Sequence, residues 1–191
     1  MKTARLEAFS DGVIAILITI MVLEFRPPHG VDWAALHDLV PSFVSYVLSF
    51  VFLGIYWSNH HHMLSMTERA TGGVLWANLH LLFWLSLVPF ATAWVGDNHR
   101  APVPTALYGI ILLGAAISYT ILQTTIIRHQ GPGSRLAAAL GDDRKGKVSV
   151  LLYVASIPLA FLEPTISDLL YATVAAIWLV PDRRIEQRLG R

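Results

Sequence analysis

Residues 9–25 read FSDGVIAILITIMVLEF, a stretch that places a serine and an aspartate at the start of a long apolar run. Thr19 is the only polar side chain between Val13 and Leu23. A helix that crosses a hydrocarbon core of about 30 Å needs roughly 20 residues. The stretch therefore predicts a membrane-spanning helix that carries polar side chains near one end.

The composition of the whole chain points the same way. Of its 191 residues, 54% are hydrophobic and 14% are charged, against about 25% charged in an average soluble domain. The apolar residues fall into six runs, at about residues 6–25, 40–64, 74–95, 104–127, 147–163 and 165–181. Lipid-exposed backbone must satisfy its own hydrogen bonds, and no run alternates like a barrel strand. We therefore predict an all-α membrane protein with six transmembrane helices.

The runs and connectors suggest one domain over residues 1–191. The last two runs are short, which leaves open two tilted helices or one hairpin bent at residues 163–165. The first connector is expected to hold a short interfacial helix around residues 33–39. The basic connector at about 128–147 is expected to be a solvated loop at the membrane surface, or else a regulatory or lipid-binding segment. Residues of about 182–191 are expected to form a cytoplasmic tail.

The positive charges predict the orientation. All Lys and Arg residues except Arg26 and Arg100 fall in the two ends and in the connectors on one side of the predicted spans. Cytoplasmic loops carry an excess of Lys and Arg, so we expect both termini in the cytoplasm. The first run has no small-residue cleavage site after it, which favours a retained helix over a signal peptide. Cysteine is absent, so disulfide and thiolate chemistry are excluded.

A helical wheel at about 100° per residue divides the first helix into two sides. One face carries a stripe made of Phe9, Gly12, Ile16, Thr19, Ile20 and Leu23. Ser10 and Asp11 point away from this stripe. The wheel alone leaves two interpretations open. The stripe could face lipid or the protein core. Alternatively, it could face the same stripe of other copies of the chain and line a pathway, which a hydrophobic constriction closes by excluding water.

The start of the first helix resembles a known family. Arg5, Phe9, Ser10 and Asp11 form RLEAFSD, which resembles the RxxxFSD signature of the transmembrane protein 175 family of potassium channels, found in endolysosomes and prokaryotes. GVIAILITIMVLE also resembles the first helix of prokaryotic members. WSNHHHML and NLHLLFWLSLVPFATAW resemble their second and third helices. The resemblance is specific in the first helix, reaches about residue 95, and afterwards rests mainly on the number of helices.

The resemblance implies a leak channel selective for potassium over sodium, in which the first helices of a homotetramer surround the pore. Carried onto this chain, the hydrophobic constriction falls at Ile16, with Ile20 and Leu23 further along. The hydroxyl ring of the selectivity region falls at Thr19, which could instead only bond its own helix. The expected partners are three further copies of the chain, which complete the homotetramer, the lipid bilayer and potassium ions. The expected location is a prokaryotic cytoplasmic membrane, with no cofactor and no nucleic acid.

Ser10 and Asp11 should reach other helices, because an unpaired carboxylate inside a membrane is costly. Arg5 and Asp11 lie too far apart around the helix to pair with each other. We expect these side chains to hold the first helix in place and to join subunits. Their candidate partners lie at a similar depth in the second and third runs, and are Asn59, His60, His61, Asn78 and His80.

The same residues give less support to a metal site, a transporter or an enzyme. Three consecutive histidines spread around a helix, so NHHH does not favour a metal site, and polar packing is preferred over proton sensing. A secondary transporter is the alternative function, but the chain shows no internal repeat. Its ionisable residues lie near span ends, and Glu163 and Asp168 fit the boundary of the last hairpin better than ion ligands. An enzyme is not expected, because no nucleophile, base and oxyanion set is visible.

Overall fold

The structure is a computed structural model that describes residues 3–141 and 143–179, and every regular element in these ranges is a helix. This confirms the all-α prediction. In chain order the elements are α1 (Thr3–Ile20), the 3₁₀ helices η1 (Met21–Glu24) and η2 (Trp33–Leu39), α2 (Val40–Ser65), α3 (Gly72–Ser86), α4 (Val88–Asp97), α5 (Pro102–Gln130), α6 (Arg135–Leu140), α7 (Arg144–Leu159) and α8 (Pro164–Leu179).

Four continuous or near-continuous helical segments are long and apolar enough to cross a membrane. They are Thr3–Glu24, Trp33–Ser65, Gly72–Asp97 and Pro102–Gln130. Each of α7 and α8 has 16 residues, which gives a length of about 24 Å at 1.5 Å per residue. That falls short of a hydrocarbon core of about 30 Å. The count of six complete spans therefore stays a prediction.

The third predicted span is broken into α3 and α4 at Leu87. Pro89 lies in the first turn of α4, where a missing N–H costs nothing, whereas inside a helix it would remove a hydrogen bond and clash with the preceding turn. The indole of Trp84, just before the break, packs where a Cβ on Gly114 of α5 would be. The absence of a side chain at Gly114 thus allows α3 and α5 to approach closely.

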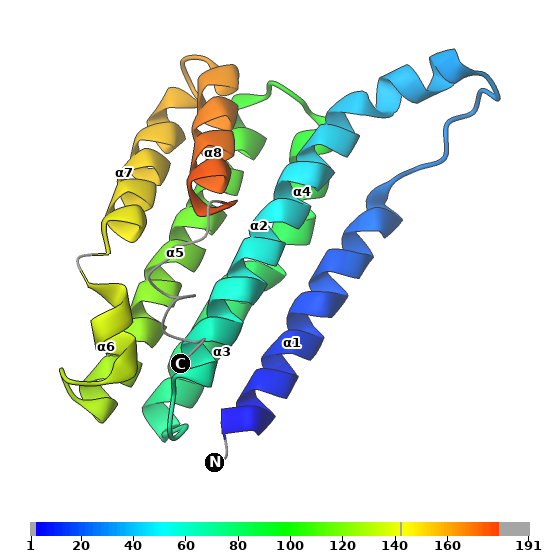
Figure 1. The fold of residues 1–191 in the computed structure, drawn as a ribbon. Helices are drawn as coiled ribbons and strands as arrows, with labels where there is room; N and C mark the ends of the chain where they lie inside the picture. Colours follow the sequence, from blue (N-terminus) through cyan, green and yellow to red (C-terminus); the bar gives the residue numbers. More distant parts are fainter. Residues whose placement is uncertain (1–2, 142, 180–191) are drawn as a thin grey trace.

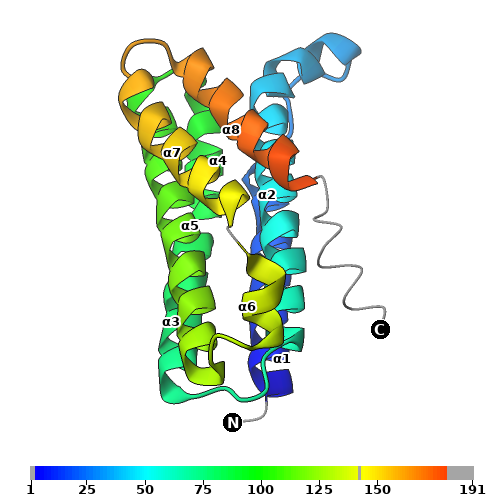
Figure 2. The same cartoon turned by 60° about the vertical axis from the view of Figure 1, so that its left-hand side comes forward.

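The helices form a bundle with α1 at one edge (Figures 1 and 2). α1 contacts α2, α3 and α4, while α5 lies between α3 and the hairpin formed by α7 and α8. The hairpin occupies only the half of the bundle farther from the N-terminus (Figure 1). Because α1 has neighbours on one side only, its other face points away from its own bundle.

Hydrogen bonds to neighbouring backbone hold the terminal hairpin on the bundle. Ser167 Oγ of α8 donates to the carbonyl of Ser156 in α7 at 2.7 Å. Tyr171 OH donates to the carbonyl of Thr105 in α5 at 2.9 Å. Of the two arrangements left open by the sequence, α7 and α8 form the hairpin. Residues 160–162 form its turn. Glu163 follows the turn and is exposed, and the Thr165 hydroxyl and N–H lower the pKa of its carboxyl.

The basic connector differs from the expected solvated loop. The helix α5 continues to Gln130, α6 follows at Arg135–Leu140, and α7 begins at Arg144. Leu136 is buried, with 3% of its surface exposed, so one apolar side chain anchors α6 to the bundle. Asp143 caps α7 by accepting the Gly146 N–H at 3.2 Å, and its burial raises the pKa of its carboxyl. The expected tail at about 182–191 lies outside the described residues.

Candidate functional site

The buried side of α1 is the side opposite to the stripe. Leu6, Ser10, Ile14 and Leu17 are buried, and Met21 of η1 continues this side. Their burial follows from the spacing of three and four residues, which places them on one face of a helix. This face attaches α1 to α2, α3 and α4.

The stripe itself is uncovered in the single chain. Exposed fractions are 53% for Phe9, 59% for Ile16, 38% for Ile20 and 78% for Leu23, and Thr19 is exposed between them. The face obtained from the helical wheel is therefore the face that this chain leaves open. A continuous apolar stripe on an edge helix must meet lipid or another protein surface.

Thr19 bonds backward along its own helix. Its hydroxyl lies 3.1 Å from the carbonyl of Ala15 and 3.0 Å from the carbonyl of Ile16, and it donates to them. Since a hydroxyl has one proton and two lone pairs, this bond leaves the oxygen available only as an acceptor. The exposed polar atom on the stripe is thus an oxygen with no free proton, which suits contact with a cation.

Ser10 joins α1 to α2 and α3 through a directional chain of hydrogen bonds. His60 Nε2 donates to Asn78 Oδ1 at 2.7 Å, Asn78 Nδ2 donates to Ser10 Oγ at 2.9 Å, and Ser10 Oγ donates to the carbonyl of Leu6 at 2.9 Å. The three side chains are fully buried. Buried polar groups bonded in series fix the helices that carry them, so this chain sets the position of α1.

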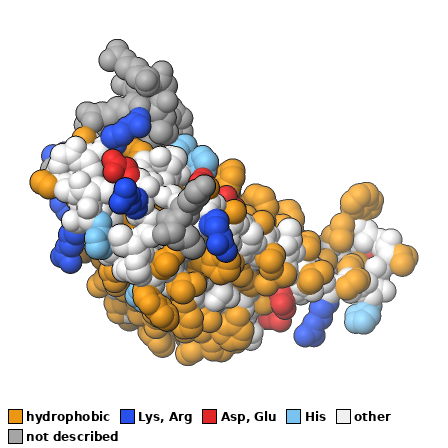
Figure 3. All heavy atoms as spheres, turned by 90° about the horizontal axis from the view of Figure 1, so that it is seen from below, with side chains coloured by type: hydrophobic (Ala, Val, Ile, Leu, Met, Phe, Trp, Pro, Cys, Tyr) orange, Lys and Arg blue, Asp and Glu red, His pale blue; other side chains and the backbone are white. Residues whose placement is uncertain are grey.

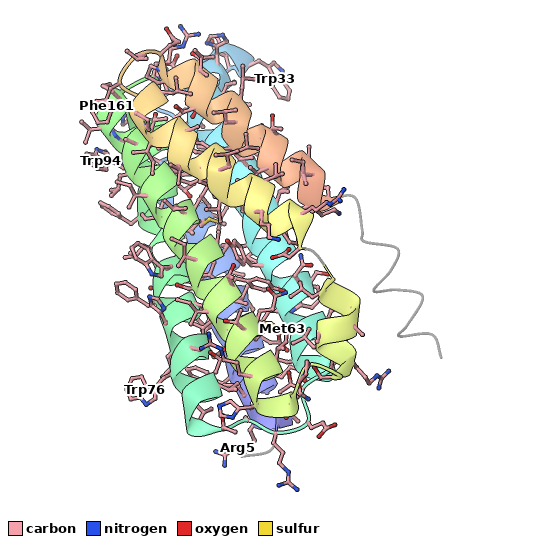
Figure 4. All side chains as sticks on the ribbon, turned by 90° about the vertical axis from the view of Figure 1, so that its left-hand side faces the viewer. Arg5, Trp33, Met63, Trp76, Trp94 and Phe161 are labelled. Carbon is pink, nitrogen blue, oxygen red and sulfur yellow. The ribbon has the colours of Figure 1, made fainter. Side chains whose placement is uncertain are left out.

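Asp11 does not take part in this chain of hydrogen bonds, and its expected bond to another helix stays a prediction. Its Oδ1 is buried and has no hydrogen-bond partner among the described residues. Arg5 is exposed and forms no ion pair within the described part of the chain, and Figure 4 shows it at the N-terminal end of the bundle. Among the described residues of one copy, the two charged residues of the signature therefore have no partner.

Glu7 was not predicted from the sequence as part of these contacts. Its carboxylate lies 2.6 Å from His61 Nδ1, which links α1 to α2 at the end near the N-terminus. The Trp57 ring stacks on the His61 ring, with centroids 6.4 Å apart. Glu7 lies four residues before Asp11 and hence on the same side of the helix. That spacing was the available signal that the helix presents two carboxylates to its surroundings.

Two of the candidate partners point elsewhere. Asn59 Nδ2 donates to the carbonyl of Ile55 in its own helix at 2.8 Å. His80 Nε2 accepts from Trp84 Nε1 at 3.1 Å, and the Ser118 hydroxyl of α5 lies 3.3 Å from His80 Nδ1. Within the described ranges, no three His, Asp or Glu side chains come together in a way that could hold a metal ion.

Comparisons with known proteins identify the family. The family model described as the endosomal/lysosomal potassium channel TMEM175 matches residues 5–89. A protein named as a potassium channel from a Chryseobacterium species is 51% identical over 189 residues, which cover 99% of this chain and 98% of that protein. One of the same description from Chamaesiphon minutus is 31% identical, over 87% of this chain and 88% of that protein.

A solved structure agrees with these matches. The crystal structure of a lysosomal potassium-selective channel TMEM175 homologue from Chamaesiphon minutus superposes with a TM-score of 0.80 at 29% sequence identity. The match covers 93% of this chain and 96% of that chain. The likeness thus extends well beyond the signature, to the helices after residue 95.

Proposed function

The chain belongs to the TMEM175 family, and on that premise we propose that it is a potassium-selective channel in which four copies place their α1 stripes around a common axis. The family is one of ion channels and not of enzymes, and the chain is a membrane protein. The tetramer, the pathway along its axis and the leak-type activity are parts of the proposal.

One observation carries the proposal. The stripe is exposed on an edge helix while the opposite side of the same helix is fixed to α2 and α3 by buried hydrogen bonds. A helix held in this way presents Ile16, Thr19 and Leu23 in a defined direction. Rotational symmetry among copies would turn these three positions into three successive rings along an axis.

The rings differ in chemistry. Ile16, Ile20 and Leu23 would form hydrophobic constrictions, which stop ion flow by excluding water when they are narrow. Thr19 lies between Ile16 and Ile20 and would supply a ring of oxygen atoms. Because each hydroxyl donates to its own helix, the ring would present acceptors to a partly dehydrated cation. Discrimination of potassium from sodium would then occur next to the constriction.

The proposed location is the cytoplasmic membrane of a prokaryote, with both termini inside. The N-terminal end of α1, the α2–α3 connector and α6 lie at or toward the same end of the bundle (Figure 1). Viewed from that end, Lys and Arg side chains gather over it (Figure 3). The excess of positive charge on cytoplasmic loops supports this orientation.

The test is the reversal potential of the purified protein in a planar bilayer, under a potassium gradient opposed by sodium. We expect stepwise currents that reverse near the potassium equilibrium potential. Flux that requires a second, gradient-coupled substrate and shows no unitary steps would instead indicate a secondary transporter. Intact oligomers without current at any voltage would contradict the proposed pathway along α1.

A further inference from the structure

Residues 25–39 form an arm that leaves the bundle at the end opposite the N-terminus. We call it the outer arm; it ends in the 3₁₀ helix η2 (Trp33–Leu39), which covers the residues expected for an interfacial helix. The outer arm projects beyond α1, past the edge of the bundle (Figure 1). Its tip carries two apolar side chains clear of the bundle, with Val31 fully exposed and Trp33 88% exposed. Figure 4 shows Trp33 at this end, and Figure 3 shows apolar side chains along the projecting segment.

An open apolar groove lies between the base of the outer arm and α2. It has a volume of about 510 Å³, which is within the range of sites that take a compact ligand or a few large side chains. Phe25 packs edge-on to Tyr46 at its wall, with ring centroids 5.2 Å apart, and Phe43 and Val40 are more than half exposed. We call this the arm groove. Nothing in the described part of the chain fills it.

The tip and the groove carry opposite charges. Arg26 lies in the lining of the arm groove and forms no ion pair with any described carboxylate. Asp32 lies in the tip, beside Trp33. One of its oxygens accepts the Ala35 N–H at 3.1 Å and caps η2, and its charge has no basic partner among the described residues. An arginine and an aspartate so placed would attract each other across an interface.

We propose that the tip of the outer arm, with Val31 and Trp33, seats in the arm groove of a second copy of this chain, where Asp32 meets Arg26. The inference rests on the proposed assembly of copies around α1. The outer arm projects beyond the edge of the bundle that α1 forms, so the contact would continue that interface outward. A lipid headgroup is the less suitable occupant, because a phosphate that attracts Arg26 repels Asp32. A tip-to-groove contact repeated from copy to copy around the fourfold axis of the proposed tetramer would close a ring.

A crosslinking experiment tests the contact directly. The chain has no cysteine, so introduced thiols report without background. Two chains with different tags are co-expressed, one with Val31→Cys and the other with Phe43→Cys. The membranes are then treated with an oxidant. We expect a disulfide-linked dimer that carries both tags. The pair Val31→Cys and Val103→Cys is the control, because Val103 is 52% exposed at the same end but lies outside the groove.

Charge removal provides a second test. Asp32→Asn keeps the helix cap, since asparagine caps as well as aspartate, and removes only the charge. We expect Asp32→Asn and Arg26→Gln each to weaken the oligomer, so that it dissociates in detergent at a protein concentration about tenfold higher than for the wild type. Because both changes break the same pair, the double variant should dissociate at the same concentration as either single variant. Asp38→Asn changes an exposed aspartate of η2 that does not line the arm groove, and it should leave this concentration unchanged.

The outcomes separate this inference from the proposed function. Absence of the mixed dimer, together with a component of brominated-lipid quenching that Trp33→Phe removes, would place the outer arm in the bilayer and overturn the inference. Potassium-selective current would then still support the proposed channel. Additive losses for Arg26→Gln and Asp32→Asn would also overturn the pairing of these two residues.

Discussion

At the residue scale, Thr19 is the most informative side chain of the stripe. Thr19→Ala removes the oxygen that we assign to the selectivity ring while keeping the helix, since alanine is the best helix former. We expect the preference for potassium over sodium to fall by about two- to tenfold, the range of one modest polar contact. The reversal potential under opposed potassium and sodium gradients measures this change.

The matched control for Thr19 is Thr124 of α5. It is also exposed, and its hydroxyl likewise donates to the carbonyls three and four residues back, at 3.0 Å and 2.8 Å. Thr124→Ala therefore removes the same kind of hydroxyl-to-carbonyl bond on a helix outside the stripe. The preference for potassium over sodium should stay unchanged. Equal reversal potentials for wild type, Thr19→Ala and Thr124→Ala would remove Thr19 from the selectivity region.

Asp11 has a carboxylate oxygen that is buried and has no partner among the described residues of one copy. A buried, unsatisfied charged group is costly, so we expect a neighbouring copy to supply the partner. Asp11→Ala should then lower the yield of oligomer in detergent by about tenfold, the effect of one hydrogen bond to a charged group. Size-exclusion chromatography measures the yield, with the exposed Glu68→Ala as control. A normal oligomer with altered selectivity would contradict this role.

Asn78 connects two buried groups, since it accepts from His60 and donates to Ser10. Asn78→Leu leaves His60 Nε2 without a partner, which should cost about 1–3 kcal/mol in the free energy of unfolding. The thermal midpoint of the detergent-solubilised protein measures this loss. Asn59→Leu removes only a bond within α2 and should change the midpoint much less. A larger loss for Asn59→Leu would show that the buried chain does not stabilise the bundle.

At the element scale, regular spacing was predictable from the sequence and tertiary contacts were only partly so. Periodicity separated the stripe from the buried side of α1, because both follow from the geometry of a single helix. Pairs such as Glu7 and His61 depend on how two helices cross, which no local pattern encodes. The short helix α6 was missed because a polar, glycine-bearing connector is typical of a loop, although Leu136 and Ala139 pack α6 against the core.

The short length of α7 and α8 explains why the sequence did not decide between two tilted helices and one hairpin. Their apolar runs resemble short spans, and only tertiary bonds such as Ser167 to Ser156 join them into a hairpin packed on α5. The resemblance in the first helix predicted the family correctly, because its signature has fixed spacing. The role of each stripe residue, by contrast, depends on contacts between copies that a single sequence does not contain.

At the scale of the whole molecule, the orientation in the membrane can be tested with the same cysteine-free chain. Single cysteines replace His29 in the outer arm and Pro132 in the connector between α5 and α6, both of which are exposed. We expect a membrane-impermeant maleimide to label His29→Cys in intact cells and Pro132→Cys only after permeabilisation, because the positive charges gather at the connector's end. The reverse pattern would place both termini outside.

The central claim is that the exposed stripe of α1 lines the ion pathway, and thiol modification of single cysteines tests it most directly. Ile16→Cys, Ile20→Cys and Leu23→Cys are compared with Ile117→Cys on α5, which is 44% exposed on another helix. A silver ion or a small cationic thiol reagent is applied during potassium current. We predict that modification at the three stripe positions blocks or strongly reduces the current while Ile117→Cys is unaffected. Unchanged current after confirmed modification of the stripe cysteines would contradict the account.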